Sequence, residues 1–316
     1  MSSPSFFDRA NCTNAPQRTP SNAGIAGAGI LLSFMITALL AIVLSAMVIF
    51  CEIRGKSSKI RRKLLSGYSD SQIMQGIGIQ SVGLAQMNKL VPYHFFLIWM
   101  LSLLSMATHN ATLLALKQDY RRDWVIRWLR QTLMFINLAL SSVSGIFILQ
   151  AVSKGLNETT YPIECVWKID GQGAPSTSAL SYVGTIVVIV GNCAIFGLAT
   201  WYLHSQQQRF YKAVQIGGLV LMTGIAIGAA VRVILESQAF GSPSVTLSDR
   251  GETEWSFGQL LSLLLVILPL ISVIEIWRGE ISVAPPVKDG TFRQKTYDGE
   301  LQDMSQDHDR RPLTQK

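Results

Sequence analysis

The sequence predicts an all-α fold: a polytopic membrane protein of seven transmembrane helices, with the N-terminus outside and the C-terminus in the cytoplasm. Three observations lead to this prediction. Only 15% of the 316 residues are charged and 49% are hydrophobic, whereas about a quarter of the residues of a soluble protein are charged. The charges are absent from several runs long enough to cross a bilayer. Basic residues gather in every second segment between those runs, as they do in membrane proteins.

A hydrocarbon core about 30 Å thick requires roughly 20 predominantly apolar residues in a helix, and several runs meet this length. They predict spans at about 24–51, 92–116, 125–152, 178–202, 214–235 and 255–277. A further span is predicted at about 71–89, because residues 71–88 carry no charge and Ser69 and Asp70 can cap the first turn.

The predicted bundle covers residues 24–277. It separates an extracellular arm at 1–23 from a cytoplasmic tail at 278–316, whose mixture of charges with Pro, Gly and Gln predicts disorder. With seven spans, the segments expected inside hold 6, 5, 2 and 7 Lys and Arg residues, and those expected outside hold 6 in all. Positive residues collect on the cytoplasmic side, so this bias sets the predicted orientation. The bias would be lost without the span at 71–89.

The cytoplasmic face explains the net charge of +7 without nucleic acid as a partner. Its densest part is the stretch 54–63, which we expect to attract anionic membrane lipid. The residues expected to contact such lipid are Arg54, Lys56, Lys59, Arg61, Arg62 and Lys63.

The segments expected outside carry two glycosylation sequons, at Asn11 and Asn157. They also carry Cys12 and Cys165. Because both cysteines would face an oxidising compartment, a disulfide between them is a hypothesis, although sequence spacing cannot test it. The sequons indicate passage through the secretory pathway. The plasma membrane is therefore the expected location, with an endomembrane as the alternative.

The predicted span at 71–89 is unusual in its amides. At about 100° per residue, Gln72, Gln75 and Gln80 fall within one arc of about 140°, which also contains Gly76 and Gly83. Glycine lets helices approach closely and amides bond across the interface, so this face is predicted to point into the bundle. The sequence leaves open whether the amides only hold the helices together or also line a cavity for water or a ligand.

Ionisable and amide side chains inside a membrane are the default candidates for a functional site. Beyond the glutamines, the polar residues that we expect to line the bundle are His109, Asn137, Asn192, Arg232 and Gln259. Each also has a structural interpretation. Arg232, for example, lies four residues before Glu236 and can form an ion pair along the helix.

The residues that several other chemistries require are missing. The four histidines form no cluster with the spacing of metal ligands, so we expect no metal site. No phosphate-binding loop is present, and no cofactor is expected. Acid catalysis would need a carboxylate of raised pKa inside the bundle. Only Glu275, near the end of the last span, comes close to such a position, and we assign no catalytic residue.

Three stretches form a recognisable pattern: SDSQIMQGIGI (69–79), PYHFFLIWMLSLLSMATHNATLLAL (92–116) and WSFGQLLSLLLVILPLISVIEI (255–276). The pattern is carried by Ser69, Asp70, Gln72, Tyr93, His94, Thr108, His109, Phe257, Gly258, Gln259, Leu268 and Pro269. Together the stretches resemble a broad group of uncharacterised fungal integral membrane proteins. Asn110 departs from that group, in which an apolar residue usually follows the Thr-His pair. The resemblance implies seven helices in a fungal membrane and supplies no activity.

Three functions agree with these features. The first is receptor-like, because the topology is that of G-protein-coupled receptors, although Asp119-Tyr120-Arg121 does not have their Asp-Arg-Tyr order and topology alone is an analogy. The second is a membrane-embedded enzyme or carrier of fungal secondary metabolism, such as a terpenoid cyclase. The third is an accessory protein that organises partners. A non-catalytic role, receptor-like or accessory, is the expected function, and the enzyme or carrier is the alternative.

Overall fold

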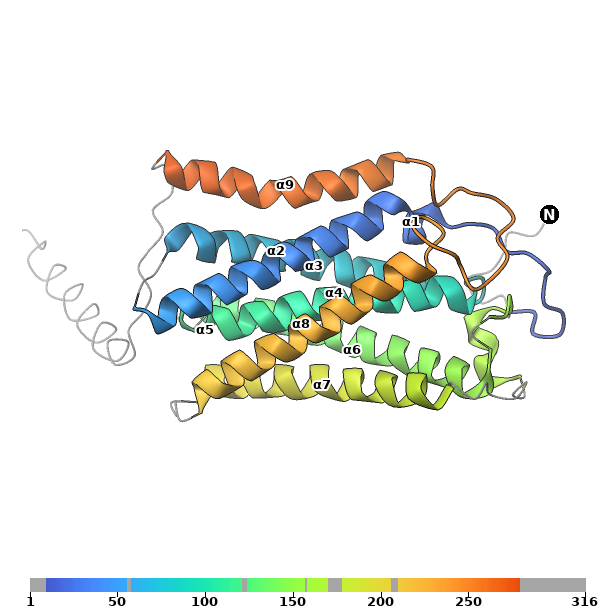
Figure 1. Ribbon diagram of the computed structural model, residues 1–316, viewed down its shortest axis with the longest axis horizontal. Coiled ribbons are helices and arrows are strands. Elements are labelled where there is room, and N and C mark those ends of the chain that lie inside the picture. The colour runs from blue at the N-terminus through green and yellow to red at the C-terminus, as the bar shows by residue number, and fades with distance from the viewer. Residues whose placement is uncertain are drawn as a thin grey trace, which may run out of the picture.

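The computed structural model describes residues 10–55, 58–120, 124–156, 158–169, 178–205 and 210–278. Within this part of the chain the regular structure is helical, apart from one isolated bridge between Thr19 and Leu247. This agrees with the predicted all-α class. The long helices lie side by side in one elongated bundle (Figure 1). The predicted tail beyond Arg278 and residues 1–9 of the predicted arm lie outside the described residues.

The elements follow in the order α1 (Ala23–Ala26), α2 (Ala28–Ile53), α3 (Lys59–Ala85), α4 (Pro92–Ala115), α5 (Lys117–Tyr120), α6 (Trp124–Lys154), η1 (Ile163–Trp167), α7 (Ser178–His204), α8 (Tyr211–Glu236) and α9 (Phe257–Trp277). The main difference from the predicted spans is at α3, which begins at Lys59 and not at residue 71. Its first turns are rich in Lys, Arg and Leu, which are good helix formers. Lys59, Arg61, Arg62 and Lys63, which we expected to lie between two spans, are therefore part of this helix.

Six helical segments are long and apolar enough to cross a membrane. They are Ala23–Ile53, Pro92–Ala115, Trp124–Lys154, Ser181–His204, Tyr211–Glu236 and Phe257–Ile276. The described chain is thus a multi-pass membrane protein with six candidate spans. Helix α3 is not one of them, because its glutamines, serines and glycines make even its uncharged second half too polar. The length and composition of the helices therefore support six of the seven predicted spans and do not test whether α3 crosses the membrane.

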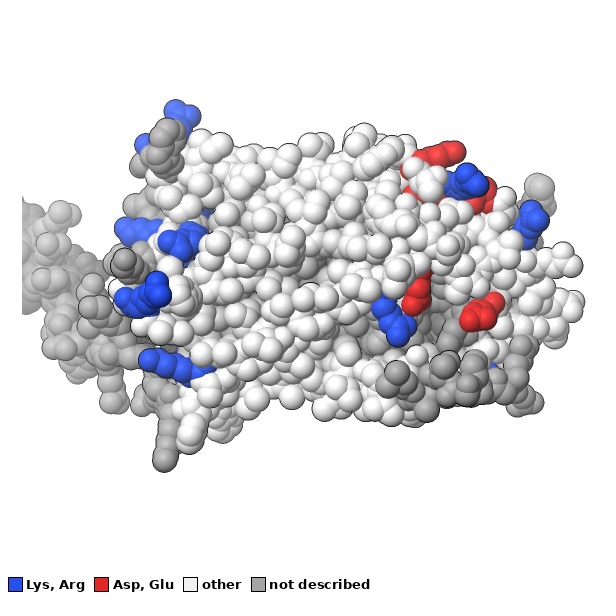
Figure 2. Space-filling model, viewed as in Figure 1, with Lys and Arg blue, Asp and Glu red and all other residues white. Residues whose placement is uncertain are grey.

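The two ends of the bundle differ, and we name them by composition. Basic side chains gather at the end where α2 finishes and α3 begins, which we call the basic end (Figure 2). The opposite end is covered by residues 10–22, η1 and the loop 237–256, and we call it the capped end. Backbone hydrogen bonds join these segments to each other and to the bundle: Thr19 N donates to Thr246 O at 3.2 Å, and Ile163 N donates to Leu90 O at 2.7 Å.

Helix α4 forms the centre of the bundle. It contacts α2, α3, α6, α7 and α8, and the whole of its apolar length is buried. A helix that is apolar on every side is expected to lie inside a bundle. Its polar side chains, among them Ser102, Ser105 and His109, therefore have to find partners on the surrounding helices or on α4 itself.

Candidate functional site

A buried polar network joins α3, α4 and α6 in the middle of the bundle. Gln80 Nε2 donates to Asn137 Oδ1 at 2.6 Å and to Gly76 O at 2.9 Å. Asn137 Nδ2 donates to Ser105 Oγ at 3.1 Å, and Ser105 Oγ lies 2.9 Å from His109 Nε2. The network thus brings together three of the predicted site residues, Gln80, Asn137 and His109.

Gly76 makes this network possible. A Cβ atom at this position would collide with Ser105 Oγ and would lie 2.9 Å from Asn137 Oδ1. Any side chain larger than hydrogen would therefore push α3 away from α4 and α6. This is the close approach that small residues permit between membrane helices, and it supports the packing interpretation of the glutamine face.

Three polar atoms near this network have no hydrogen-bond partner among the residues that the structure describes. They are Gln72 Oε1, Gln80 Oε1 and His109 Nδ1. Their residues are fully buried, and Gln72 is otherwise held only by a bond of 3.4 Å from its Nε2 to Phe34 O. Buried polar atoms in this situation are the usual binding places of ordered water. The network therefore also has the residue types for a small internal hydration site.

The remaining predicted residues lie outside the network. Gln75 is half-buried and bonds Ser71 Oγ at 3.4 Å on its own helix. Asn192 Oδ1 accepts a bond of 3.3 Å from Asn110 Nδ2, which links α7 to α4. Gln259 Oε1 accepts from Gly29 N at 3.1 Å and so fastens α9 to α2.

A cavity of about 790 Å³ lies between α4, α6, α7 and α8, toward the capped end. Near the basic end α7 and α8 touch, with the rings of Tyr202 and Tyr211 5.5 Å apart, and they diverge toward the capped end (Figure 1). Gly184, Gly224 and Gly228 line the space between them, and a Cβ atom on any of the three would meet nothing within 4 Å. The cavity thus lies where α7 and α8 diverge and where these glycines leave space between them.

The cavity has an apolar wall and a charged edge. Tyr93, Phe96 and Trp99, spaced three residues apart on α4, form an aromatic side. At the edge, Arg232 Nη1 lies 3.3 Å from Glu236 Oε1, the ion pair along α8 that the sequence indicated. Glu158, from the loop after α6, also lines the cavity. The charged groups of the lining are therefore few, and Ser181, Thr185 and Ser244 add hydroxyl groups.

Glu252 is a functional candidate that sequence reasoning missed. This carboxylate belongs to the loop 237–256, yet it is fully buried under the capped end. It accepts a hydrogen bond of 2.8 Å from Tyr93 Oη and lies 2.8 Å from His94 Nε2. Tyr93 also lines the cavity, so it connects the cavity wall to the cap. In the sequence, Tyr93 and His94 stood out only as part of the recognised pattern, and nothing indicated that Glu252 contacts them.

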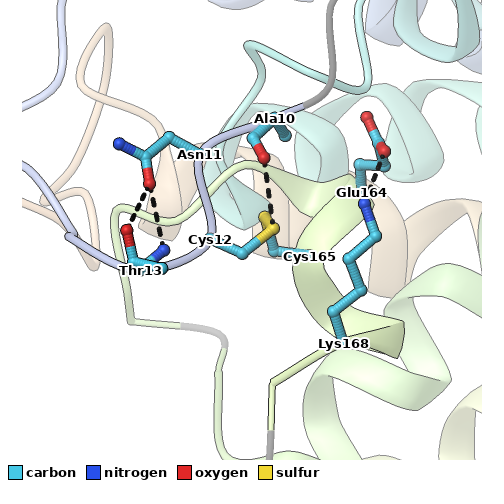
Figure 3. The surroundings of a disulfide bond; sticks show 7 residues. All are labelled: Ala10, Asn11, Cys12, Thr13, Glu164, Cys165 and Lys168. Atoms are coloured by element: carbon cyan, nitrogen blue, oxygen red, sulfur yellow. Dashed lines mark hydrogen bonds and ion pairs between the residues drawn. A yellow bond between two sulfur atoms is a disulfide. The ribbon is translucent and has the colours of Figure 1, made fainter.

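At the capped end, η1 is joined covalently to the N-terminal arm. Cys12 and Cys165 form a disulfide with their Cα atoms 5.5 Å apart (Figure 3). Beside it, Asn11 Oδ1 accepts hydrogen bonds from the backbone and hydroxyl of Thr13, and the Asn11 side chain is exposed. Asn157, the other predicted glycosylation site, lies outside the described residues.

Asp249 joins the arm to the loop 237–256 at the capped end. The Ser21 hydroxyl donates a short hydrogen bond to its carboxylate, and the backbone N–H of Gly251 donates another at 3.0 Å. These two donors, the hydroxyl first, hold the pKa of Asp249 at about 2, below its ordinary value. The arm and the loop 237–256 are thus joined by a carboxylate that is ionised at any physiological pH.

The basic residues predicted to contact anionic lipid occupy different environments. Arg54, Lys59 and Lys63 are exposed. Arg62 is instead buried and donates to Asp119 Oδ1 at 2.8 Å, which ties α3 to α5. Arg61 donates to Cys51 Sγ at 3.0 Å, and Lys56 lies outside the described residues.

The fold and the site thus define an all-helical, multi-pass membrane protein with a buried polar network and a separate apolar cavity. Within the described residues, no group of three or more His, Cys, Asp or Glu side chains is placed to hold a metal ion. Comparison of the chain with protein-family models, with curated proteins and with solved structures found no match. The resemblance to fungal membrane proteins therefore stays a prediction.

Proposed function

We propose that the chain crosses the membrane seven times, with the capped end outside and the basic end in the cytoplasm. Helix α2 ends at the basic end and α4 begins at the capped end, so if both cross, α3 must cross between them. Its 27 residues span about 40 Å at 1.5 Å per residue, which exceeds the thickness of the hydrocarbon core. The charge of the basic end supports a cytoplasmic position.

Exposed aromatic residues support the same placement. Trp124, Trp128 and Trp201 are exposed near the basic end, and Trp167 and Trp255 near the capped end. Tryptophan is enriched at both membrane–water interfaces, so these two groups mark the expected boundaries of the bilayer. The disulfide of the cap suits an oxidising, non-cytoplasmic compartment, and we infer that the protein resides in the plasma membrane.

Within this topology, we propose a receptor-like function: the protein binds a small, largely apolar molecule between α4, α6, α7 and α8. The single observation that carries this proposal is the cavity of about 790 Å³, because ligand sites typically measure about 300–1,000 Å³ and are mostly apolar with a few polar groups. The edge formed by Arg232, Glu236 and Glu158 supplies those groups.

The lining favours binding over catalysis. The described residues of the lining include no His or Asp, Glu236 is engaged by Arg232 at the edge, and Glu158, the other carboxylate of the lining, is exposed. His109, the histidine predicted to line the bundle, bonds Ser105 in the polar network and is not part of the cavity wall. General acid–base chemistry requires a proton donor or acceptor within reach of the substrate, so the cavity is better suited to hold a molecule than to convert it.

The test compares the wild type with Gly224→Leu, which fills the cavity from α8. Gly217→Leu is the matched control, because it lies two turns away on the same face of α8, also has open space beside it, and does not line the cavity. Each protein is purified in mild detergent and its bound small molecules are extracted and identified by mass spectrometry. We expect one compound class to accompany the wild type and Gly217→Leu but not Gly224→Leu. Equal amounts with all three proteins, or none with any, would refute the proposal.

A further inference from the structure

The charges at the edge of the cavity do not balance. Its lining contains one basic side chain, Arg232, and two acidic ones, Glu158 and Glu236. The guanidinium of Arg232 is already engaged, with Nη1 3.3 Å from Glu236 Oε1 and its Cζ 6.0 Å from the centre of the Phe96 ring. Within the described residues, Glu158 has no ion-pair partner. The lining thus holds one more acidic side chain than basic side chains, and the unpaired one, Glu158, is exposed.

The aromatic side of the cavity also favours a positively charged group. Tyr93, Phe96 and Trp99 lie on one side of α4 and line the cavity together. The hydroxyl of Tyr93 is occupied, because it donates to Glu252 and accepts from Gln238 N at 2.9 Å. Its ring remains available, and the faces of aromatic rings attract cations.

The rest of the lining is uncharged and contains mostly apolar side chains. Beyond the charged residues, the cavity is bounded mostly by apolar residues of α4, α6, α7 and α8 and by the glycines Gly184, Gly224 and Gly228, with hydroxyl groups from Ser181, Thr185 and Ser244. A ligand complementary to these surfaces needs an apolar body to fill the space between α7 and α8. It also needs one polar group to meet the edge.

We propose that the ligand of this cavity is an amphipathic amine: an apolar body bearing a single positively charged amino group. In this proposal the amino group meets the carboxylates of the lining, and the body lies between α7 and α8. This inference rests on the proposed function and adds the chemical class of the ligand. A carboxylate or phosphate in the same place would meet the two glutamates with only one arginine to offset them.

The test uses three photoreactive probes that share one long alkyl diazirine chain and end in an amine, an alcohol or a carboxylate. Full-length protein is placed in phosphatidylcholine nanodiscs, irradiated with each probe, and digested so that the labelled peptides can be quantified. We expect the amine to label peptides of α4 and α8 about two- to fivefold more than the alcohol does, the range that partly exposed ion pairs provide. The carboxylate is expected to label them least.

Variants of the edge sharpen the test. Glu236→Gln and Glu158→Gln are expected to lower labelling by the amine toward that of the alcohol, while labelling by the alcohol stays constant. Arg232→Gln is expected to act in the opposite direction and raise labelling by the amine. Glu254→Gln is the matched control: it removes a negative charge at the same end from an exposed residue that does not line the cavity.

The outcomes separate this inference from the proposed function. If Gly224→Leu blocks all three probes but the amine labels no more than the alcohol or the carboxylate, the cavity binds ligands and the assignment of an amine is wrong. If Gly224→Leu blocks none of the probes, the cavity is not a binding site and both proposals fail. Preferential labelling by the amine that depends on Glu158 and Glu236 but not on Glu254 supports the assignment.

Discussion

Gln80 on α3 and Asn137 on α6 are joined by a buried hydrogen bond of 2.6 Å. Both side chains are fully buried, and the bond connects two helices through residues that are 57 positions apart in the chain. In a membrane such a bond has no water to compete with it, although measured values per bond stay modest. The pair therefore tests how much the polar network contributes to the bundle.

We expect Gln80→Leu and Asn137→Leu each to destabilise the protein by about 1–3 kcal/mol, because Gln80→Leu removes the donor to the buried Asn137 Oδ1 and Asn137→Leu leaves Gln80 Nε2 with Gly76 O on its own helix. The double variant should cost less than the sum, with a coupling of about 0.6–1.7 kcal/mol. Reversible unfolding in mixed micelles measures all three values. Gln75→Leu is the control, because Gln75 bonds only its own helix and is half-buried. A coupling near zero would mean that the bond contributes nothing to helix association.

Two glycines of α3 give a matched pair of substitutions. Gly76→Ala would place a methyl group against Ser105 Oγ and 2.9 Å from Asn137 Oδ1, and we expect it to cost about 1–3 kcal/mol through overpacking. Gly78→Ala would meet nothing within 4 Å and should be neutral or slightly stabilising, since alanine favours the helix. Thermal midpoints in detergent compare the two. Equal midpoints would show that α3 does not approach α4 as closely as described.

The disulfide between Cys12 and Cys165 closes a chain segment of 153 residues. A cross-link across so long a segment restricts the unfolded chain, so replacing both cysteines with serine should destabilise the protein by about 2–5 kcal/mol. The double variant avoids leaving a lone thiol. Thermal unfolding of the wild type with and without reductant, beside that of the variant, measures the effect. If reductant lowers the midpoint of the variant as much as that of the wild type, the effect does not come from this bond.

The link between the arm and the loop 237–256 should depend on pH through Asp249. Its pKa in the folded protein, about 2, is below the ordinary value of 3.8. The carboxylate therefore contributes its full stabilisation above about pH 4 and loses it as pH falls toward about 2. The contribution is small because Asp249 is exposed and screened by solvent.

The measurement follows the difference in thermal midpoint between the wild type and Asp249→Asn as the pH is lowered. We expect the difference to be constant above about pH 4 and to shrink toward zero near pH 2. Ser21→Ala should reproduce the behaviour of Asp249→Asn, because Ser21 is the main donor to this carboxylate. A difference in midpoint that does not change with pH would show that ionisation of Asp249 does not stabilise the link.

The sequence predicted the buried side of α3 because the helical repeat is regular. Gln72, Gln80 and Gly76 fall on one face of a helix, and the structure buries all three, whereas Gln75, predicted for the same face, is half-buried. His109 and Asn137 meet Gln80 for the same reason, since each is a polar residue on an otherwise apolar helix. The predicted start of this helix at residue 71 was wrong, because the basic residues that precede it also favour a helix.

The cavity and the position of Glu252 could not be predicted in this way. The cavity depends on the angle between α7 and α8, which is set by packing along their whole length, and glycines such as Gly224 are common in membrane helices without a cavity beside them. Glu252 lies in a loop, where no repeat relates sequence position to direction. Its burial results from contacts with Tyr93 and His94 that are more than 150 residues away in the chain.

The most direct test of the account is whether the two ends of α3 lie on opposite sides of the membrane. The free cysteines Cys51 and Cys193 are replaced with serine, and the disulfide is kept. Ser58→Cys then places a thiol at the basic end, and Gln86→Cys places one at the capped end. Intact cells are treated with a membrane-impermeant maleimide before and after permeabilisation.

A seven-span protein with its cap outside predicts that Gln86→Cys is labelled in intact cells and that Ser58→Cys is labelled only after permeabilisation. Labelling of both thiols from the same side would show that α3 does not cross the membrane. It would remove the seventh span on which the orientation of the bundle and the external position of the cavity depend.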